Sequence, residues 1–152
     1  MDENPGSRIA DVSRLMRRSF DARARGIGVT RPQWQVLSAL RRHEGINQGK
    51  LADLLDVEPI TVCRMVDRLQ EADLVERRTD PADRRSWRLF LTAKAHELLG
   101  HLRPLADEML EQAFEGVEDA DRTRLMATLE RVRQNLTRRP PNSLGEPMVS
   151  HG

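Results

Sequence analysis

The chain of 152 residues contains no tyrosine and only one cysteine, and aromatic residues make up 3% of it. A single cysteine, Cys63, excludes an internal disulfide and a zinc site built from cysteines. No stretch approaches the roughly 18 consecutive apolar residues of a membrane span. The acidic N-terminus also lacks the apolar core of a signal peptide. We therefore expect a reduced cytoplasmic protein of one domain, or of one domain with an extension.

The sequence also has little that would support catalysis or metal binding. Its four histidines, which lack the spacing of metal ligands, are His43, His96, His101 and His151. There is no glycine-rich phosphate loop and no serine nucleophile motif. We accordingly expect no enzyme activity, no metal and no cofactor.

Charge is abundant but unevenly distributed. The net charge is only +1. Residues 8–31 nevertheless carry seven arginines against two aspartates, and residues 77–88 carry five arginines against two aspartates. Residues 104–121 carry seven carboxylates and no basic residue. Such opposite fields suggest a polyanionic partner that meets one face only, although solvated helix faces in an arginine-rich protein would give the same pattern.

The spacing of apolar residues predicts six helices, over about residues 7–25, 30–43, 47–55, 59–72, 92–114 and 119–136. Thr30 and Gln33 form a capping-box pattern at the second helix. Asn47, Thr92 and Asp119 can cap the third, fifth and sixth helices. The third and fourth helices, joined by a tight loop, match a helix-turn-helix, although any pair of packed helices would fit so far.

A β-hairpin is predicted directly after the fourth helix. Residues 74–78 and 87–92 have the composition of strands, and residues 80–83 have that of a turn. A helix-turn-helix followed by a hairpin with an arginine-rich tip is a winged helix, and this combination is far more specific than either part. The predicted fold is mainly α with a small β-hairpin wing.

The first, fifth and sixth predicted helices carry more apolar surface than a core of about 65 residues can cover. We therefore expect a second, identical chain to cover it. The predicted organisation is dimerisation helices over residues 1–29 and 93–138, a winged helix-turn-helix over residues 30–92, and a disordered tail over residues 139–152.

Linked motifs between Val57 and Thr92 add a family resemblance. They are Arg-Met-Val-Asp-Arg-Leu at 64–69, Leu-Val-Glu-Arg at 74–77, Asp-Arg-Arg at 83–85 and Leu-Thr at 91–92. With them, the chain resembles the multiple-antibiotic-resistance regulator (MarR) family of bacterial transcription factors over about residues 8–138. The resemblance implies a homodimer whose winged lobes read a pseudo-palindromic site in duplex DNA. It also implies a repressor that a small, often phenolic or anionic, effector releases.

The sequence departs from the family pattern in two places. Asp73 stands where the family usually has glycine, at a position that favours a left-handed backbone. Glu58, Pro59 and Ile60 replace the small hydroxyl residues common at the start of the fourth helix, and Cys63 stands where threonine is frequent. The operator sequence therefore cannot be transferred from better-known members.

The first turns of the fourth helix are expected to enter the major groove. Thr61 and Arg64 lie there, and arginine suits bidentate contact with guanine, although Arg64 could instead be a solvated surface residue. Pro59 and Ile60 can contact a thymine methyl group. Arg68 is expected to contact a phosphate or to pair with a neighbouring carboxylate.

At the wing, the resemblance assigns Arg85 to the minor groove, whose narrow A·T-rich form attracts arginine. Asp83 is expected to hold Arg85 extended by pairing with its guanidinium. Further phosphate contacts are expected from Gln48, Lys50, Arg77 and Arg84.

The resemblance places an effector pocket between the dimerisation helices and each winged lobe. The candidate lining residues are Met16, Arg17, Phe20, Trp34 and Leu37. An ordinary core would use the same apolar residues.

Two alternatives concern regulation, and a third concerns function. Cys63 could sense oxidation, but a small half-buried helix residue is the preferred interpretation. His43 and Glu44 could suggest zinc sensing, but the paired histidine expected on the fifth helix is missing. The alternative function is a winged-helix module that binds protein, or an architectural DNA-binding protein without an effector.

Overall fold

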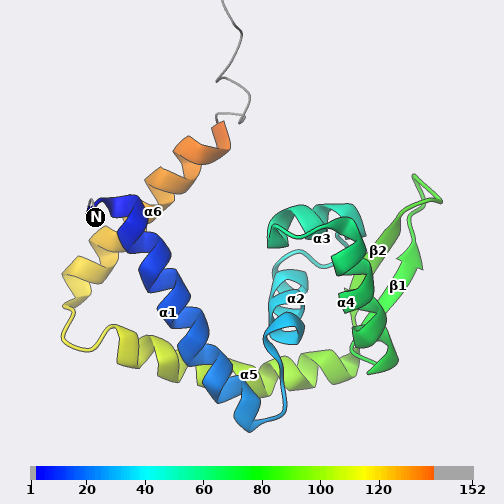
Figure 1. Ribbon diagram of the computed structural model, residues 1–152, viewed down its shortest axis with the longest axis horizontal. Coiled ribbons are helices and arrows are strands. Elements are labelled where there is room, and N and C mark those ends of the chain that lie inside the picture. Colours follow the sequence, from blue (N-terminus) through cyan, green and yellow to red (C-terminus); the bar gives the residue numbers. More distant parts are fainter. Residues whose placement is uncertain (1–2, 139–152) are drawn as a thin grey trace, which may run out of the picture. The chain divides into compact units, whose positions relative to one another are not determined.

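The computed structural model describes residues 3–138, which form six helices and one antiparallel hairpin (Figure 1). The elements are α1 (Pro5–Gly26), α2 (Arg31–Arg42), α3 (Gln48–Leu55), α4 (Pro59–Glu71), β1 (Val75–Thr79), β2 (Trp87–Leu91), α5 (Ala93–Ala113) and α6 (Asp119–Arg138). The predicted tail over residues 139–152 lies outside the described residues. None of the described helices combines the length and apolar character that a membrane crossing needs.

The predicted helix starts are largely confirmed, because the capping side chains make the expected bonds. Thr30 and Gln33 form the full capping box. Asn47 Oδ1 accepts from the backbone N–H of Lys50 at 2.8 Å. Thr92 Oγ1 accepts from the backbone N–H of Ala95 at 3.1 Å. The sixth helix differs from the expectation, because Asp119 is its first residue rather than the cap before it.

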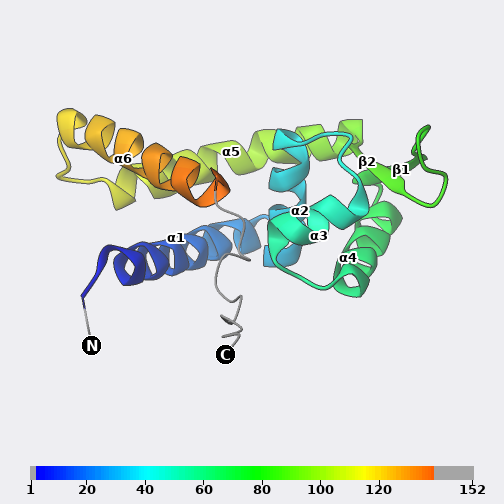
Figure 2. The same ribbon diagram turned by 90° about the horizontal axis from the view of Figure 1, so that it is seen from above.

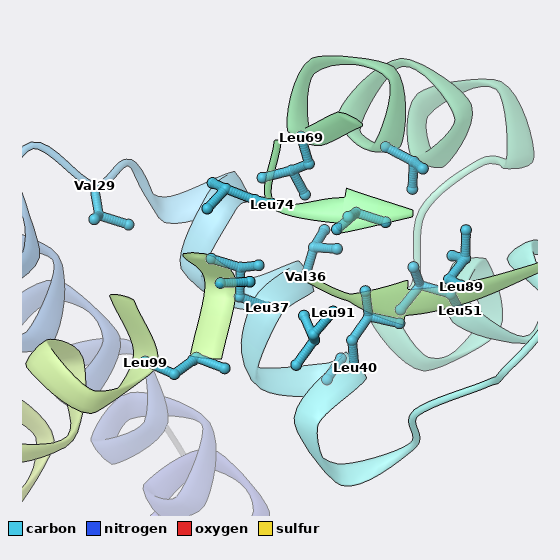
Figure 3. Packing of buried hydrophobic residues seen from close by; sticks show 14 of the residues in the cluster. Val29, Val36, Leu37, Leu40, Leu51, Leu69, Leu74, Leu89, Leu91 and Leu99 are labelled. Atoms are coloured by element: carbon cyan, nitrogen blue, oxygen red, sulfur yellow. The ribbon is translucent and has the colours of Figure 1, made fainter. Parts of the chain in front are cut away.

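The chain divides into two units, one ending at Ala113 and one beginning at Phe114. In the first unit, α2, α3, α4 and the hairpin enclose an apolar core, and α5 continues it toward α1 (Figure 3). The largest fully buried side chains are Leu37, Leu40, Leu51, Leu69, Leu89, Val36, Val62 and Val66. Burial of this set fixes the orientation of each helix in the lobe, because each amphipathic helix must turn its apolar face inward.

The hairpin is the predicted wing. β1 pairs with β2 in a register that runs from Val75 opposite Leu91 to Thr79 opposite Trp87. The turn between the strands extends beyond α2, α3 and α4 in both views (Figures 1 and 2). Leu89 and Leu91 are buried, as a half-buried strand requires. The turn of the wing therefore lies outside the packed lobe, whereas the strands reach into its core.

A short extended segment before α3 pairs with β2, which the sequence did not predict. The Gly45 N–H donates to the Leu89 carbonyl at 2.8 Å, and the Leu89 N–H donates to the Ile46 carbonyl at 3.0 Å. Gly45 has a φ of 82°, a left-handed conformation that glycine adopts without strain. The pairing fastens the wing to the start of α3.

The link between α4 and β1 confirms the expected left-handed backbone at Asp73, whose φ is 59°. The Leu74 N–H donates to the Leu69 carbonyl at 2.9 Å and closes the end of the helix. Aspartate tolerates this conformation better than most residues. The chain consequently passes from α4 into the wing through only three residues, 72–74.

The second unit contains α6. Arg122 donates to the Phe114 carbonyl at 2.9 Å, and its guanidinium carbon lies 5.3 Å from the centre of the Phe114 ring. These contacts fix the turn that precedes the helix. No residue of α6 is buried.

Candidate nucleic-acid interface

The helix α4 owes its orientation to a buried face and a proline start. Pro59 occupies the first turn, where its missing N–H costs little. Val62, Val66 and Leu69 are at most 1% exposed and pack into the core. The opposite face must therefore point to solvent along the whole helix.

That outward face carries the residues of α4 that were predicted to contact DNA. Thr61, Arg64 and Arg68 are exposed, and Ile60 is 60% exposed. No hydrogen bond or ion pair involves the Arg64 or Arg68 side chains within residues 3–138, so the alternative that Arg68 pairs with a neighbouring carboxylate is not realised. The side chains are consequently available to a polyanion.

The wing turn is shaped by two aspartates. Asp80 Oδ1 accepts from the Ala82 N–H at 2.9 Å, and Asp83 Oδ1 accepts from the Arg85 N–H at 2.9 Å. Asp83 Oδ2 also accepts from the Ser86 hydroxyl at 3.3 Å. The expected pair between the Asp83 carboxylate and the Arg85 guanidinium does not form, because the carboxylate bonds to the local backbone instead. Asp83 thus positions Arg85 through the turn.

The other arginines near the wing are partly engaged by the protein. The guanidinium carbon of Arg78 lies 4.1 Å from the centre of the Phe90 ring, within cation–π range. Arg78 also bonds to Glu76, and that hydrogen bond lowers the pKa of the Glu76 carboxyl. Arg88 Nε donates to the Gly45 carbonyl at 2.9 Å. The two arginines in the turn remain the exposed cations of the wing tip.

Arg77 is largely enclosed by the protein, with a side chain 13% exposed. Its guanidinium bonds to Gln48 at the start of α3 and to Cys63, Asp67 and Gln70 on α4. The predicted phosphate contact of Arg77 therefore competes with a full set of protein partners.

The start of α3 lies beside Arg77. Gln48 is half-buried and its Oε1 accepts from Arg77 Nε at 3.3 Å, whereas Lys50 is exposed. The Lys50 backbone N–H is already bonded to Asn47. Of Gln48 and Lys50, only Lys50 therefore has a side chain without a hydrogen bond or ion pair among residues 3–138.

A sequence model of the MarR family matches residues 27–86. The structure of a MarR transcriptional regulator from Methanosarcina mazei Go1 is 30% identical, with a TM-score of 0.78, and the match covers 88% of this chain and 96% of that one. This chain belongs to the MarR family.

Further MarR-family structures share the fold. A regulator from Silicibacter pomeroyi is 25% identical, with a TM-score of 0.73 and coverage of 84% of this chain and 86% of that one. A mutant MarR from E. coli, complexed with operator DNA, is 23% identical, with a TM-score of 0.71 and coverage of 84% and 91%. The winged helix predicted from the sequence is confirmed as a MarR-family fold, and the family is one of transcriptional regulators.

The five residues expected to line an effector pocket lie in different surroundings. Phe20 and Trp34 pack edge to face with ring centres 4.8 Å apart, and Leu37 is fully buried beside them. Met16 instead lines a hollow of about 320 Å³ between α1 and α5, together with residues such as Val12 and Met109. Arg17 is exposed. Phe20 and Leu37 thus belong to the apolar core, and Trp34 packs against it.

Sequence reasoning missed the polar contact that joins α1 to α2 beside this core. Asp21 Oδ1 accepts from Trp34 Nε1 at 2.7 Å, and Asp21 also forms an ion pair with Arg31. Desolvation raises the pKa of Asp21, but the hydrogen bonds from Arg31 and Trp34 outweigh it and leave the pKa below its usual value. A tryptophan 13 residues after an aspartate gives no recognisable spacing in sequence.

Within the described residues, no three histidine, cysteine, aspartate or glutamate side chains gather into a group that could hold a metal ion. Cys63 is free and half-buried, as the preferred interpretation expected.

Proposed function

We propose that this MarR-family protein is a homodimeric repressor that binds a pseudo-palindromic site in duplex DNA. The observation that carries the proposal is the placement of two basic elements on one packed lobe. The exposed face of α4 presents Arg64 and Arg68, and the wing turn presents Arg84 and Arg85. An exposed helix face of this kind suits a major groove, and an arginine-tipped hairpin suits the adjoining minor groove.

The remaining predicted contacts have supporting roles in this proposal. Thr61 lies one turn before Arg64 on the exposed face of α4 and is placed to contact a base. Ile60 offers an apolar side chain to a thymine methyl group. Lys50 adds a positive charge at the start of α3. The wing arginines and Arg68 are assigned to phosphates or to the minor groove.

The homodimer is supported by apolar surface that each unit leaves exposed. On α1, Ile9, Val12 and Leu15 are between 44% and 47% exposed. The exposed apolar residues of α6 are Leu125, Met126, Leu129, Val132 and Leu136. An amphipathic helix with no buried residue gains little from tertiary packing, so a second copy of the chain is the proposed cover.

The proposed repressor also responds to a small effector that binds beside α1. The Phe20–Trp34 contact joins α1 to the winged lobe, so a ligand that enters beside it would alter the position of α1 relative to α2. We expect such a ligand to change the fluorescence of Trp34 and to weaken DNA binding together.

The proposal is tested by DNA binding and by mass in solution. Gel shifts with the DNA that flanks the protein's own gene should give a discrete complex that scrambled duplexes do not compete away. Sedimentation should give about 35 kDa, twice the chain mass of 17.4 kDa. A well-folded monomer, or equal affinity for every duplex and single strand, would contradict the proposal and favour a protein-binding or architectural role.

A further inference from the structure

The strongest unassigned feature of the lobe is the set of contacts made by the Arg77 guanidinium. Arg77 Nη1 lies 2.7 Å from Asp67 Oδ1 and 2.8 Å from Gln70 Oε1. Arg77 Nη2 donates to the Cys63 carbonyl at 3.2 Å, and Nε donates to Gln48 Oε1 at 3.3 Å. One side chain of β1 is thus bonded to both helices of the helix-turn-helix.

The partners on α4 share one face of the helix. Residues 63, 67 and 70 follow the i, i+4, i+7 spacing, so the contacts extend along two turns. Bonds at two levels of a helix fix its rotation as well as its distance from β1. Arg64, the proposed base-reading residue, follows Cys63 directly, so its direction depends on that rotation.

The position of Arg77 in the hairpin connects this helix to the wing. Arg77 pairs with Leu89 across the two strands, and the strands lead directly to the turn that carries Arg84 and Arg85. The same guanidinium therefore couples the element assigned to the major groove with the element assigned to the minor groove. A side chain that is 13% exposed and has four partners is also poorly placed to neutralise a phosphate.

We propose that Arg77 is a positioning residue for DNA recognition, which holds α4 and the wing in the relative orientation that fits one site in duplex DNA. It acts through Asp67, Gln70 and the Cys63 carbonyl, without contacting DNA itself. The inference rests on the proposed function, and it replaces the phosphate contact that the sequence suggested for this residue.

The first test separates a positioning residue from a phosphate contact. Arg77→Ala should lower affinity for the cognate duplex by about tenfold, since coupled polar networks of this kind carry effects of that order. Affinity for a scrambled duplex should change much less. The slope of log affinity against log salt should stay as in the native protein, because no phosphate contact is lost. Arg84→Ala is the matched comparison and should lower that slope by about one.

The second test uses Asp67, where electrostatics and positioning predict opposite signs. Removing a carboxylate near DNA should raise affinity if only charge matters. Asp67→Ala should instead lower affinity for the cognate duplex, because Arg77 loses a partner. Glu71→Ala is the matched control, since it removes an exposed carboxylate of the same helix that is not bonded to Arg77. In the double variant, Asp67→Ala should add little to the loss caused by Arg77→Ala.

The outcomes distinguish this inference from the proposed function. If the native protein binds no duplex selectively, the proposed function fails. If the native protein binds selectively but Arg77→Ala weakens cognate and scrambled duplexes equally and reduces the salt slope, Arg77 is a phosphate contact and only this inference fails. The far-ultraviolet circular dichroism spectra of Arg77→Ala and Asp67→Ala should match that of the native protein. Should Arg77→Ala unfold, Asp67→Ala against Glu71→Ala still decides the matter, because Asp67 is half-exposed on the helix surface.

Discussion

The Asp83 carboxylate accepts a hydrogen bond from the backbone N–H of Arg85 at 2.9 Å, and this bond determines how the wing presents its arginine. The carboxylate closes a local turn and leaves the Arg85 guanidinium without a hydrogen bond or ion pair among residues 3–138. The residue that shapes the turn and the residue assigned to the minor groove are thus coupled through the backbone.

This coupling predicts a graded series of wing variants. Arg85→Ala should weaken binding to all duplexes and remove any preference for A·T-rich flanks, because the minor-groove cation is lost. Asp83→Ala should give a weaker version of the same defect. Asp83→Asn should behave almost as the native protein, since its side-chain oxygen can still accept the Arg85 N–H. Binding curves on A·T-rich and G·C-rich flanks at one salt concentration test the series. An Asp83→Asn defect as large as that of Asp83→Ala would show that charge matters more than the turn.

Arg64→Ala should fail in a different way. Loss of a base contact should cost about 1–3 kcal/mol on the cognate duplex and much less on scrambled DNA. Specificity should relax at one base pair in each half-site, which a set of single-base-pair substitutions in the duplex would reveal. An equal loss on cognate and scrambled duplexes would assign Arg64 to a phosphate.

Acid should weaken the contact between α1 and α2. The folded-state pKa of Asp21 lies below its usual value of 3.8. Its ionised form therefore stabilises the fold above that usual value, and the stabilisation is lost as the pH falls through the folded-state pKa. Asp21→Asn removes the charge but keeps an acceptor for Trp34. Unfolding curves at fixed protein concentration should show a higher free energy of unfolding for the native protein than for Asp21→Asn at pH 7, and this difference should shrink as the pH falls below 3.8. If the difference in unfolding free energy between the native protein and Asp21→Asn does not change with pH, the ion pair of Asp21 is not the cause of that difference.

A charge on the apolar face of α6 should separate the proposed dimer. Leu129→Asp places a carboxylate among exposed apolar residues, and burying it at an interface would be costly. Ala127→Asp is the control, since it adds the same charge to an exposed position away from the apolar stripe. Sedimentation at micromolar concentration should give a lighter or aggregating species for Leu129→Asp only. A dimer that survives Leu129→Asp would place the interface elsewhere.

Local patterns explain why most of the fold could be predicted. Helix starts follow from short-range bonds, such as those of Thr30 and Thr92, which sequence spacing reveals directly. The wing follows from the alternation around Leu89 and from turn residues. The strand-like pairing of Gly45 with Leu89 joins residues 44 positions apart, so no local pattern indicates it.

The site was predicted less well because its details depend on tertiary contacts. The sequence predicts a phosphate contact for Arg77 because its four partners lie on two helices, α3 and α4, that are distant from it along the chain. The spacing of Cys63, Asp67 and Gln70 gave one usable signal, a polar row on the helix that precedes β1. At Asp83, the expected guanidinium partner was wrong, because the carboxylate accepts from the Arg85 backbone N–H. An aspartate two residues before its partner is the usual pattern of a local turn.

Selection of duplexes from a random pool, followed by a salt titration on the selected sequence, tests the central claim most directly. We expect a pseudo-palindromic sequence with two half-sites about one helical turn apart, because two lobes related by two-fold symmetry must reach the same face of the duplex. With roughly six to eight phosphates neutralised, affinity should fall about 10³–10⁴-fold between 50 and 200 mM salt. An unenriched pool, a flat salt response, or equal affinity for single strands would contradict the account.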